Sequence, residues 1–294
     1  MLSEEALKLI KQLREQRNPY PDWERKNYEK ERHAFDKFAI DLNYPKTISI
    51  HEECVGGVRC EWIKKQDAEK LIIFIHGGGF TSGSALARRE AFVGICLAAN
   101  MSGISIDYPL APEHPYPEGL IGCVNVYKGL LELKYQPEQL HIFGESAGAT
   151  LALAAALYLK AEDIHLPKSI CVFSPVAEIA SDTKRLSKRM QSEILLPLNL
   201  FEEIKAVYCN ENDLRDPCLS PIYGDFYGFP PVMIQVGSEE MLLEDSYLLR
   251  DRLEEADVKC TFHKWEGLFH SFLIMPLPES QMVYQEIGIF LKDT

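Results

Sequence analysis

Short apolar runs that alternate with helical stretches constrain the fold of this chain more than any other feature. Runs of strand length lie at 71–76, 104–107, 141–143, 170–174, 232–236 and 259–265. Helical patterns follow them at 86–100, 118–133, 147–161, 241–256 and 279–292. Strands that alternate with helices, and that are apolar on both faces, form a parallel sheet covered on both sides. Two β-rich runs at 46–54 and 58–63 add an antiparallel pair. We therefore predict an α/β fold with a mostly parallel eight-stranded sheet and helices on both faces.

Two regions depart from this alternation. Residues 1–45 contain two amphipathic helical stretches, the second at 22–38, separated by Pro19 and Pro21. The long interval 177–230 separates two strands and contains further helical stretches, at 183–192 and 199–208. A connection of this length is usually functional. We expect the two regions to form a helical cap over the strand ends.

Composition and charge narrow the classes of function. The 294 residues are 46% hydrophobic and 26% charged, as in ordinary globular proteins. The net charge of −13 argues against nucleic acid as a partner, because an acidic surface repels phosphates. The N-terminal segment has no apolar core, and the apolar run at 147–159 is shorter than the roughly 20 residues that span a bilayer. We expect a cytoplasmic protein without membrane insertion.

The cysteines do not indicate a metal or redox site. None of the eight forms a C-x-x-C pair. Cys96, Cys123 and Cys171 lie in apolar runs, where a buried free thiol is the simplest interpretation. We therefore predict no metal and no organic cofactor.

The strongest chemical signal is the sequence Gly144-Glu145-Ser146-Ala147-Gly148. It follows an apolar strand and opens an apolar helix, which is the context of a G-x-S-x-G nucleophile elbow. Such a turn strains the serine and raises its hydroxyl above the sheet edge, and the following amide points toward developing negative charge. Ser146 is the candidate nucleophile. The alternative is a glycine-rich turn with an incidental serine.

A second signal, His76-Gly77-Gly78-Gly79-Phe80, directly follows the strand at 71–76. Consecutive glycines expose backbone amides, which an oxyanion hole requires. We expect His76 to fix this loop by hydrogen bonding. The alternatives are a flexible turn or a phosphate-binding loop, but the spacing and the lysine of a P-loop are absent.

A nucleophilic serine needs a base that an acid orients, in the chain order Ser, Asp or Glu, His. Of the eight histidines, His270 alone lies in the loop after the last predicted strand, so it is the candidate base. The acid is expected after the strand at 232–236, where Glu239, Glu240, Glu244 and Asp245 compete. An acidic helix N-terminus explains some of these carboxylates equally well.

Four motifs together resemble the hormone-sensitive-lipase-like family of α/β-hydrolase esterases, also called the GDXG family. They are HGGGF (76–80), DYPLAPEHPYP (107–117), GESAG (144–148) and HSF (270–272). The resemblance covers most of residues 46–294. It implies a catalytic domain over 46–294, with a cap made of 1–45 and the inserted segment 177–225. It also implies a homodimer that pairs through the last strand.

Carried over by position, the resemblance implies a triad of Ser146, His270 and Glu240. It also implies an oxyanion hole made by the amides of Gly78, Gly79 and Ala147. Glu240 stands at the first position of the family's D-P-L-x-D motif, so this chain has glutamate where aspartate is usual, and Glu239 remains a rival.

The segment 107–117 departs from the family in a second way. Pro109 replaces the usual arginine, which predicts a changed local salt-bridge network. We expect Glu113 and His114 to brace the loops of the site, although capping a turn is an equal alternative. Candidate pocket walls are Phe80, Leu200, Phe201 and Tyr208, although an ordinary place in the core is the simpler interpretation for any one of them.

These expectations describe a serine carboxylesterase that hydrolyses a small-molecule ester of short to medium acyl chain through an acyl-enzyme. An amidase or peptidase could use the same groups, and nothing in the motifs separates the two. A non-catalytic small-molecule receptor would be expected to lack His270. An interfacial lipase fits the acidic charge less well.

Overall fold

The computed structural model describes residues 2–37, 44–181 and 190–294, and it shows one eight-stranded sheet. The strand order is β1-β2-β4-β3-β5-β6-β7-β8. β1 pairs with β2 and β2 with β4 in antiparallel orientation, whereas all other pairs are parallel. The strands are β1 (Ile48–Val55), β2 (Val58–Lys65), β3 (Leu71–Ile75), β4 (Ser102–Ile106), β5 (Leu140–Glu145), β6 (Ser169–Phe173), β7 (Val232–Gly237) and β8 (Cys260–Trp265). The predicted fold class is confirmed.

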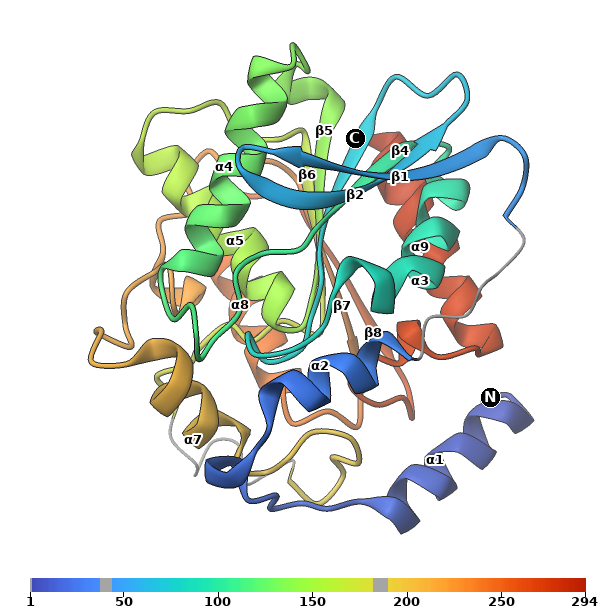
Figure 1. The fold of residues 1–294 in the computed structure, drawn as a ribbon, viewed down its shortest axis with the longest axis vertical. Helices are drawn as coiled ribbons and strands as arrows, with labels where there is room; N and C mark the ends of the chain where they lie inside the picture. The colour runs from blue at the N-terminus through green and yellow to red at the C-terminus, as the bar shows by residue number, and fades with distance from the viewer. Residues whose placement is uncertain (1, 38–43, 182–189) are drawn as a thin grey trace.

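Helices cover both faces of the sheet (Figure 1). One face carries α4 (Glu118–Glu132), α5 (Ala147–Ala161) and α8 (Leu243–Glu255), and the other carries α3 (Ala85–Ala99) and α9 (Pro278–Asp293). Successive strand residues point to opposite faces. In β3, Ile73 and Ile75 join the core with α4 and α5, while Ile72 and Phe74 join the core with α3 and α9. Because both faces are buried, the strand is apolar throughout, as the sequence indicated.

Segments from the N-terminus and from the interval after β6 lie together beyond the carboxyl ends of the parallel strands (Figure 1). They are α1 (Glu4–Gln16), α2 (Tyr28–Asp36), α7 (Leu200–Ile204) and the π-helical turn Lys205–Cys209. The amide of Leu198 donates to the carbonyl of Pro19 at 2.8 Å, and Lys26 pairs with buried Glu203 at 2.7 Å. These contacts join the two regions, which are far apart in the sequence.

Two helix predictions differ from the structure. The helix predicted over 22–38 is a short 3-10 turn at Trp23–Arg25 followed by α2, because Asn27 caps the new helix by accepting from the amide of Lys30. The helix predicted over 199–208 continues from α7 into the π-helical turn. Most of the stretch predicted at 183–192 lies outside the described residues. The cysteines Cys96, Cys123 and Cys171 are buried free thiols, as predicted.

Candidate active site

Ser146 lies in a sharp turn between β5 and α5. Its φ of 55° and ψ of −122° are unusual for a residue with a side chain, and its amide donates to the carbonyl of Phe173 at 2.8 Å. A Cβ added to Gly148 would lie 2.0 Å from the carbonyl oxygen of Ile75, so only glycine lets the helix start so close to β3. The turn therefore depends on this glycine, and the strain at Ser146 is typical of a nucleophile elbow.

His270 and Glu240 meet Ser146 in a continuous hydrogen-bonded chain. The Nε2 atom of His270 lies 2.8 Å from the Oγ atom of Ser146, and its Nδ1 atom lies 2.8 Å from Oε2 of Glu240. All three side chains are buried. They come from loops that follow β5, β7 and β8, whose carboxyl ends share one edge of the sheet. The distances have the hydrogen-bond geometry that a serine nucleophile and its base require.

The carboxylate of Glu240 is held by two further donors. Its Oε1 atom accepts from the amide of Gly237 at 2.6 Å and from the hydroxyl of Ser174 at 2.7 Å. The rival carboxylate of Glu239 is half-buried, and it accepts from the hydroxyl of Ser238. Of the two glutamates, the structure brings Glu240 to His270.

The loop after β3 lies beside the serine turn because β3 and β5 are neighbours, with Ile75 opposite Gly144. Gly78 has a φ of 127°, which favours glycine, and its carbonyl accepts from the amide and the hydroxyl of Ser82 at 3.0 and 2.9 Å. Within the described parts of the chain, the amides of Gly78, Gly79 and Ala147 donate no hydrogen bond to protein. They are thus free to bind an anion.

The electrostatic surroundings of His270 favour its protonated form. Burial lowers the pKa of its imidazole, but the carboxylates of Glu240, Glu193 and Glu145 raise it more, so the net pKa lies above the ordinary value of histidine. Stabilisation of the imidazolium is what a general base needs at the moment when it takes a proton.

Four residues at the site carried no signal that the sequence analysis used. Ser174 directly follows β6, and its hydroxyl donates to the carboxylate of Glu240. Glu193 lies in the interval after β6, and its carboxylate accepts from the amide of Met241 at 3.0 Å. Glu145 and Ser271 adjoin the nucleophile and the base within two of the quoted motifs, and their side chains contact each other. Contacts between distant segments are not visible in local sequence spacing. The motifs GESAG and HSF could nevertheless have indicated Glu145 and Ser271, because both residues lie within them.

The other predicted residues were expected to fix loops or to line the pocket. His76 is buried and its Nδ1 lies 2.8 Å from the carbonyl of Gly77, in keeping with a loop-fixing role. Phe80 stacks on Tyr208 with ring centroids 4.0 Å apart. Glu113 pairs with Arg32 of α2, whereas the exposed imidazole of His114 lies 2.6 Å from the carboxylate of Glu118, one turn later. His114 therefore does not brace the site.

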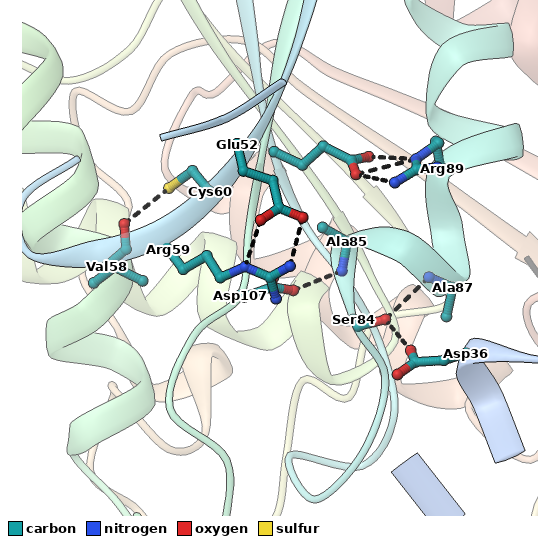
Figure 2. A network of polar contacts seen from close by, with 11 residues as sticks. Asp36, Glu52, Val58, Arg59, Cys60, Ser84, Ala85, Ala87, Arg89 and Asp107 are labelled. Carbon is teal, nitrogen blue, oxygen red and sulfur yellow. Dashed lines mark hydrogen bonds and ion pairs between the residues drawn. The ribbon is translucent and has the colours of Figure 1, made fainter. Parts of the chain in front are cut away.

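Ion pairs reach the segment around Pro109 from two elements outside it. Asp107 accepts from the amide of Ala85 at 2.7 Å and pairs with Arg59 of β2, which also binds Glu52 (Figure 2). Arg32 reaches the same segment from α2 through the carbonyl of Ala111 at 2.7 Å. The network thus anchors this turn to the antiparallel end of the sheet and to α2. The turn lies beside the loop of residues 76–80, the candidate oxyanion loop.

Among residues 2–37, 44–181 and 190–294, no cluster of three or more metal-ligating side chains occurs. No described helix is long and apolar enough to cross a bilayer.

A family model described as the alpha/beta hydrolase fold matches residues 72–274. This chain belongs to the α/β-hydrolase family. The hydrolase is 36% identical to an esterase of Acinetobacter venetianus over 83% of this chain and 82% of that protein. It is 33% identical to an acetyl-hydrolase of Streptomyces hygroscopicus, over 81% of each.

A solved structure of an esterase from the bacterial hormone-sensitive lipase family is similar to this hydrolase over 100% of this chain and 99% of that one. The TM-score is 0.91 and the identity is 28%. The predicted membership of the hormone-sensitive-lipase-like branch is confirmed, and with it the general class of carboxylic ester hydrolase.

Proposed function

We propose that this hydrolase is a serine carboxylesterase that cleaves short- to medium-chain acyl esters through a Ser146-His270-Glu240 triad. The observation that carries the proposal is the chain of two 2.8 Å contacts from the hydroxyl of Ser146 through His270 to Glu240. His270 takes the proton of Ser146 as the hydroxyl attacks the ester carbonyl, and Glu240 orients the imidazole and stabilises its charge. His270 then gives the proton to the leaving alcohol.

The amides of Gly78, Gly79 and Ala147 would bind the oxygen of the ester carbonyl as it becomes negative. Donors that are already oriented stabilise this charge without reorganisation, and one such donor is worth about 100-fold or more in kcat. The acyl-enzyme on Ser146 is then hydrolysed by water, which His270 activates in the same way.

The cap and the chain-length preference belong to the same proposal. Residues 1–45 and 177–225 would form the cap, an interpretation supported by the contacts of Leu198 with Pro19 and of Lys26 with Glu203. A Cβ added to Gly79 would lie 3.6 Å from the Leu200 side chain, which places the inserted region against the oxyanion loop. A leucine side chain in this position would restrict the length of the acyl group that the site accepts.

The test is hydrolysis of p-nitrophenyl acetate, butyrate, octanoate and palmitate by the wild-type protein and by Ser146→Ala. We expect turnover that declines from butyrate to palmitate and that falls by about 10³-fold or more in the variant, because the nucleophile is absent. A matched p-nitroanilide measures amide cleavage. Equal turnover by Ser146→Ala would remove Ser146 from the mechanism.

A further inference from the structure

The buried carboxylate of Glu145, which directly precedes Ser146, contacts the loop that follows β3, the loop that carries His270, and Arg88 on α3. We propose that Glu145 is a positioning residue that holds the oxyanion loop and the His270 loop in a fixed relation to Ser146. The inference deepens the proposed esterase function and rests on it. Glu145 directly precedes Ser146, and in the proposed mechanism its side chain does not contact the substrate.

The first contact fixes the start of the oxyanion loop. The amide of Gly77 donates to Oε2 of Glu145 at 2.8 Å. A Cβ on Gly77 would lie 2.4 Å from that same oxygen, so only glycine lets the backbone approach the carboxylate so closely. The next residue, Gly78, is bound on its carbonyl side by Ser82. The peptide units that present the amides of Gly78 and Gly79 are therefore held from both ends.

The second contact fixes the loop that carries the base. The hydroxyl of Ser271 donates to Oε1 of Glu145, and Ser271 directly follows His270. Ser271 has a φ of 51°, a left-handed conformation that is unfavourable for a non-glycine residue and persists only where surrounding contacts impose it. The bond to Glu145 is one such contact, and it sets the backbone from which the imidazole extends.

The third contact keeps Glu145 charged. Its Oε2 atom lies 3.2 Å from Nε of Arg88 on α3, and both side chains are buried. Burial raises the pKa of the Glu145 carboxyl, but Arg88 and the bond from Ser271 lower it more, so the group is ionised. An ionised carboxylate accepts from several donors at once, whereas a protonated one would turn a donor toward one of them.

The charge of Glu145 also acts on the base. The ionisable groups that raise the pKa of His270 are Glu240 after β7, Glu193 of the inserted region and Glu145 itself. The titratable and charged groups that interact with Glu145 are Arg88, His270, His76 and Tyr108. Burial lowers the pKa of His76 and raises the pKa of Tyr108, so both side chains remain neutral. Loss of the Glu145 charge should therefore lower the pKa of His270 and extend activity to lower pH.

The test compares Glu145→Gln with wild type in the pH profile of p-nitrophenyl butyrate hydrolysis. Glutamine has the same shape but presents an NH2 group to one of the three donors. We expect kcat to fall by at least about tenfold with KM within about twofold, because the misplaced groups act in the transition state. We also expect the acidic limb of kcat/KM to move to lower pH. A role in stability alone would not move that limb.

A matched control lies one residue along α3. Half-buried Arg89 pairs with buried Glu61 of β2 (Arg89 is labelled in Figure 2), so Glu61→Gln breaks a partly buried ion pair two strands away from β3. We expect Glu61→Gln to lower the melting temperature and to leave kcat and the pH profile unchanged. The double variant Arg88→Met/Glu145→Gln removes the unpaired guanidinium, so it should recover stability without recovering kcat.

The outcomes separate this inference from the proposed function. Absence of ester hydrolysis by the wild-type protein would count against the proposed function. In that case, the two proteins are compared by the rate at which a fluorophosphonate labels Ser146. We expect this labelling rate to fall in Glu145→Gln by the same factor as that given above for kcat. Unchanged rates and pH profile in Glu145→Gln would overturn the positioning role. Recovery of full activity by the double variant would overturn it as well, because stability alone would then explain the loss.

Discussion

At the scale of single residues, four non-glycine residues with positive φ gather around the candidate site. They are Phe80 in the oxyanion loop, Ser146 at the nucleophile turn, and Ser174 and Ser271 in the loops that hold the acid and the base. Such conformations cost on the order of 1–3 kcal/mol each, and they persist where the surroundings determine them fully. Backbone strain is therefore present at four positions where the geometry of a few atoms decides the reaction rate.

The choice between two adjacent carboxylates gives a sharp prediction at this scale. Glu240→Gln should lower kcat by about 10³- to 10⁴-fold, because a triad whose acid is neutral no longer fixes the imidazole tautomer. Glu239→Gln should change kcat by less than about twofold, since its half-buried carboxylate contacts Ser238 and not His270. Steady-state kinetics on p-nitrophenyl butyrate measures both.

Glu240→Asp serves as the control for the pair. It keeps the charge and shortens the side chain by one methylene, so we expect a loss intermediate between those of the two amide variants. The assignment of the acid would move to residue 239 if Glu239→Gln were the more damaged protein. Melting temperatures of all three variants show whether any loss reflects unfolding, because Glu240 also accepts from Gly237 and Ser174.

At the scale of elements, α7 is the part of the inserted region that approaches the oxyanion loop. Leu200 lies against Gly79, and the π-helical turn after α7 brings Tyr208 onto Phe80. Leu200→Ala removes three carbon atoms beside the proposed hole. We expect the ratio of octanoate to acetate turnover to rise by about threefold or more, because one methylene group in a hydrophobic pocket changes discrimination by about 10-fold or more.

The control for α7 is Leu133→Ala, at a position 54% exposed at the end of α4, which should leave the ratio unchanged. An equal change in both variants, or no change in Leu200→Ala, would show that α7 does not limit the acyl group. The absolute rate on acetate is measured alongside, since displacement of the oxyanion loop would lower the rates on all esters together.

The central parallel strands were predictable because they are largely apolar on both faces and alternate with helices along the chain. The continuous run at 71–75 and the strand–turn–helix context of Ser146 are local patterns, and the structure reproduces both. The break between Arg25 and Tyr28 was missed, because Lys26 reaches Glu203 of a distant segment. Glu240 was identified by its resemblance to a known motif and not by spacing. Ser174 could not be predicted, because its role arises only when β6 and β7 lie side by side.

At the scale of the whole molecule, the central parallel strands are largely apolar, and His141 is a titratable exception among them. It lies on β5 between β3 and β6, its side chain is fully buried, and its Nδ1 is 2.8 Å from the hydroxyl of Ser169. Burial, with smaller effects of Lys70 and Lys168, lowers the pKa of this imidazole to about 4. The folded protein therefore keeps His141 neutral at pH values where an unfolded chain would protonate it.

This difference predicts how the stability of the whole molecule depends on pH. An unfolded histidine binds a proton near pH 6.5, so from about pH 6.5 down to about 4 the unfolded chain holds one proton more than the folded chain at this site. The free energy of unfolding should thus decrease as the pH is lowered through this window, by roughly 3 kcal/mol from His141 alone. Buried His76 acts in the same direction, because burial lowers its pKa, whereas His270, whose pKa is raised, acts in the opposite direction.

The variant His141→Asn isolates the contribution of this one side chain. Asparagine can keep the bond to Ser169 but does not titrate, and its smaller volume should make the variant less stable than wild type at pH 7.5. We expect urea unfolding to show this gap narrowing as the pH falls toward 4.5, because the wild type loses stability that the variant does not have. Dilute samples are needed, since the pI of about 5.1 lies in the window. A gap that stays constant with pH would mean that His141 is protonated in the folded chain, and the sheet would then have to hold a buried positive charge between two strands.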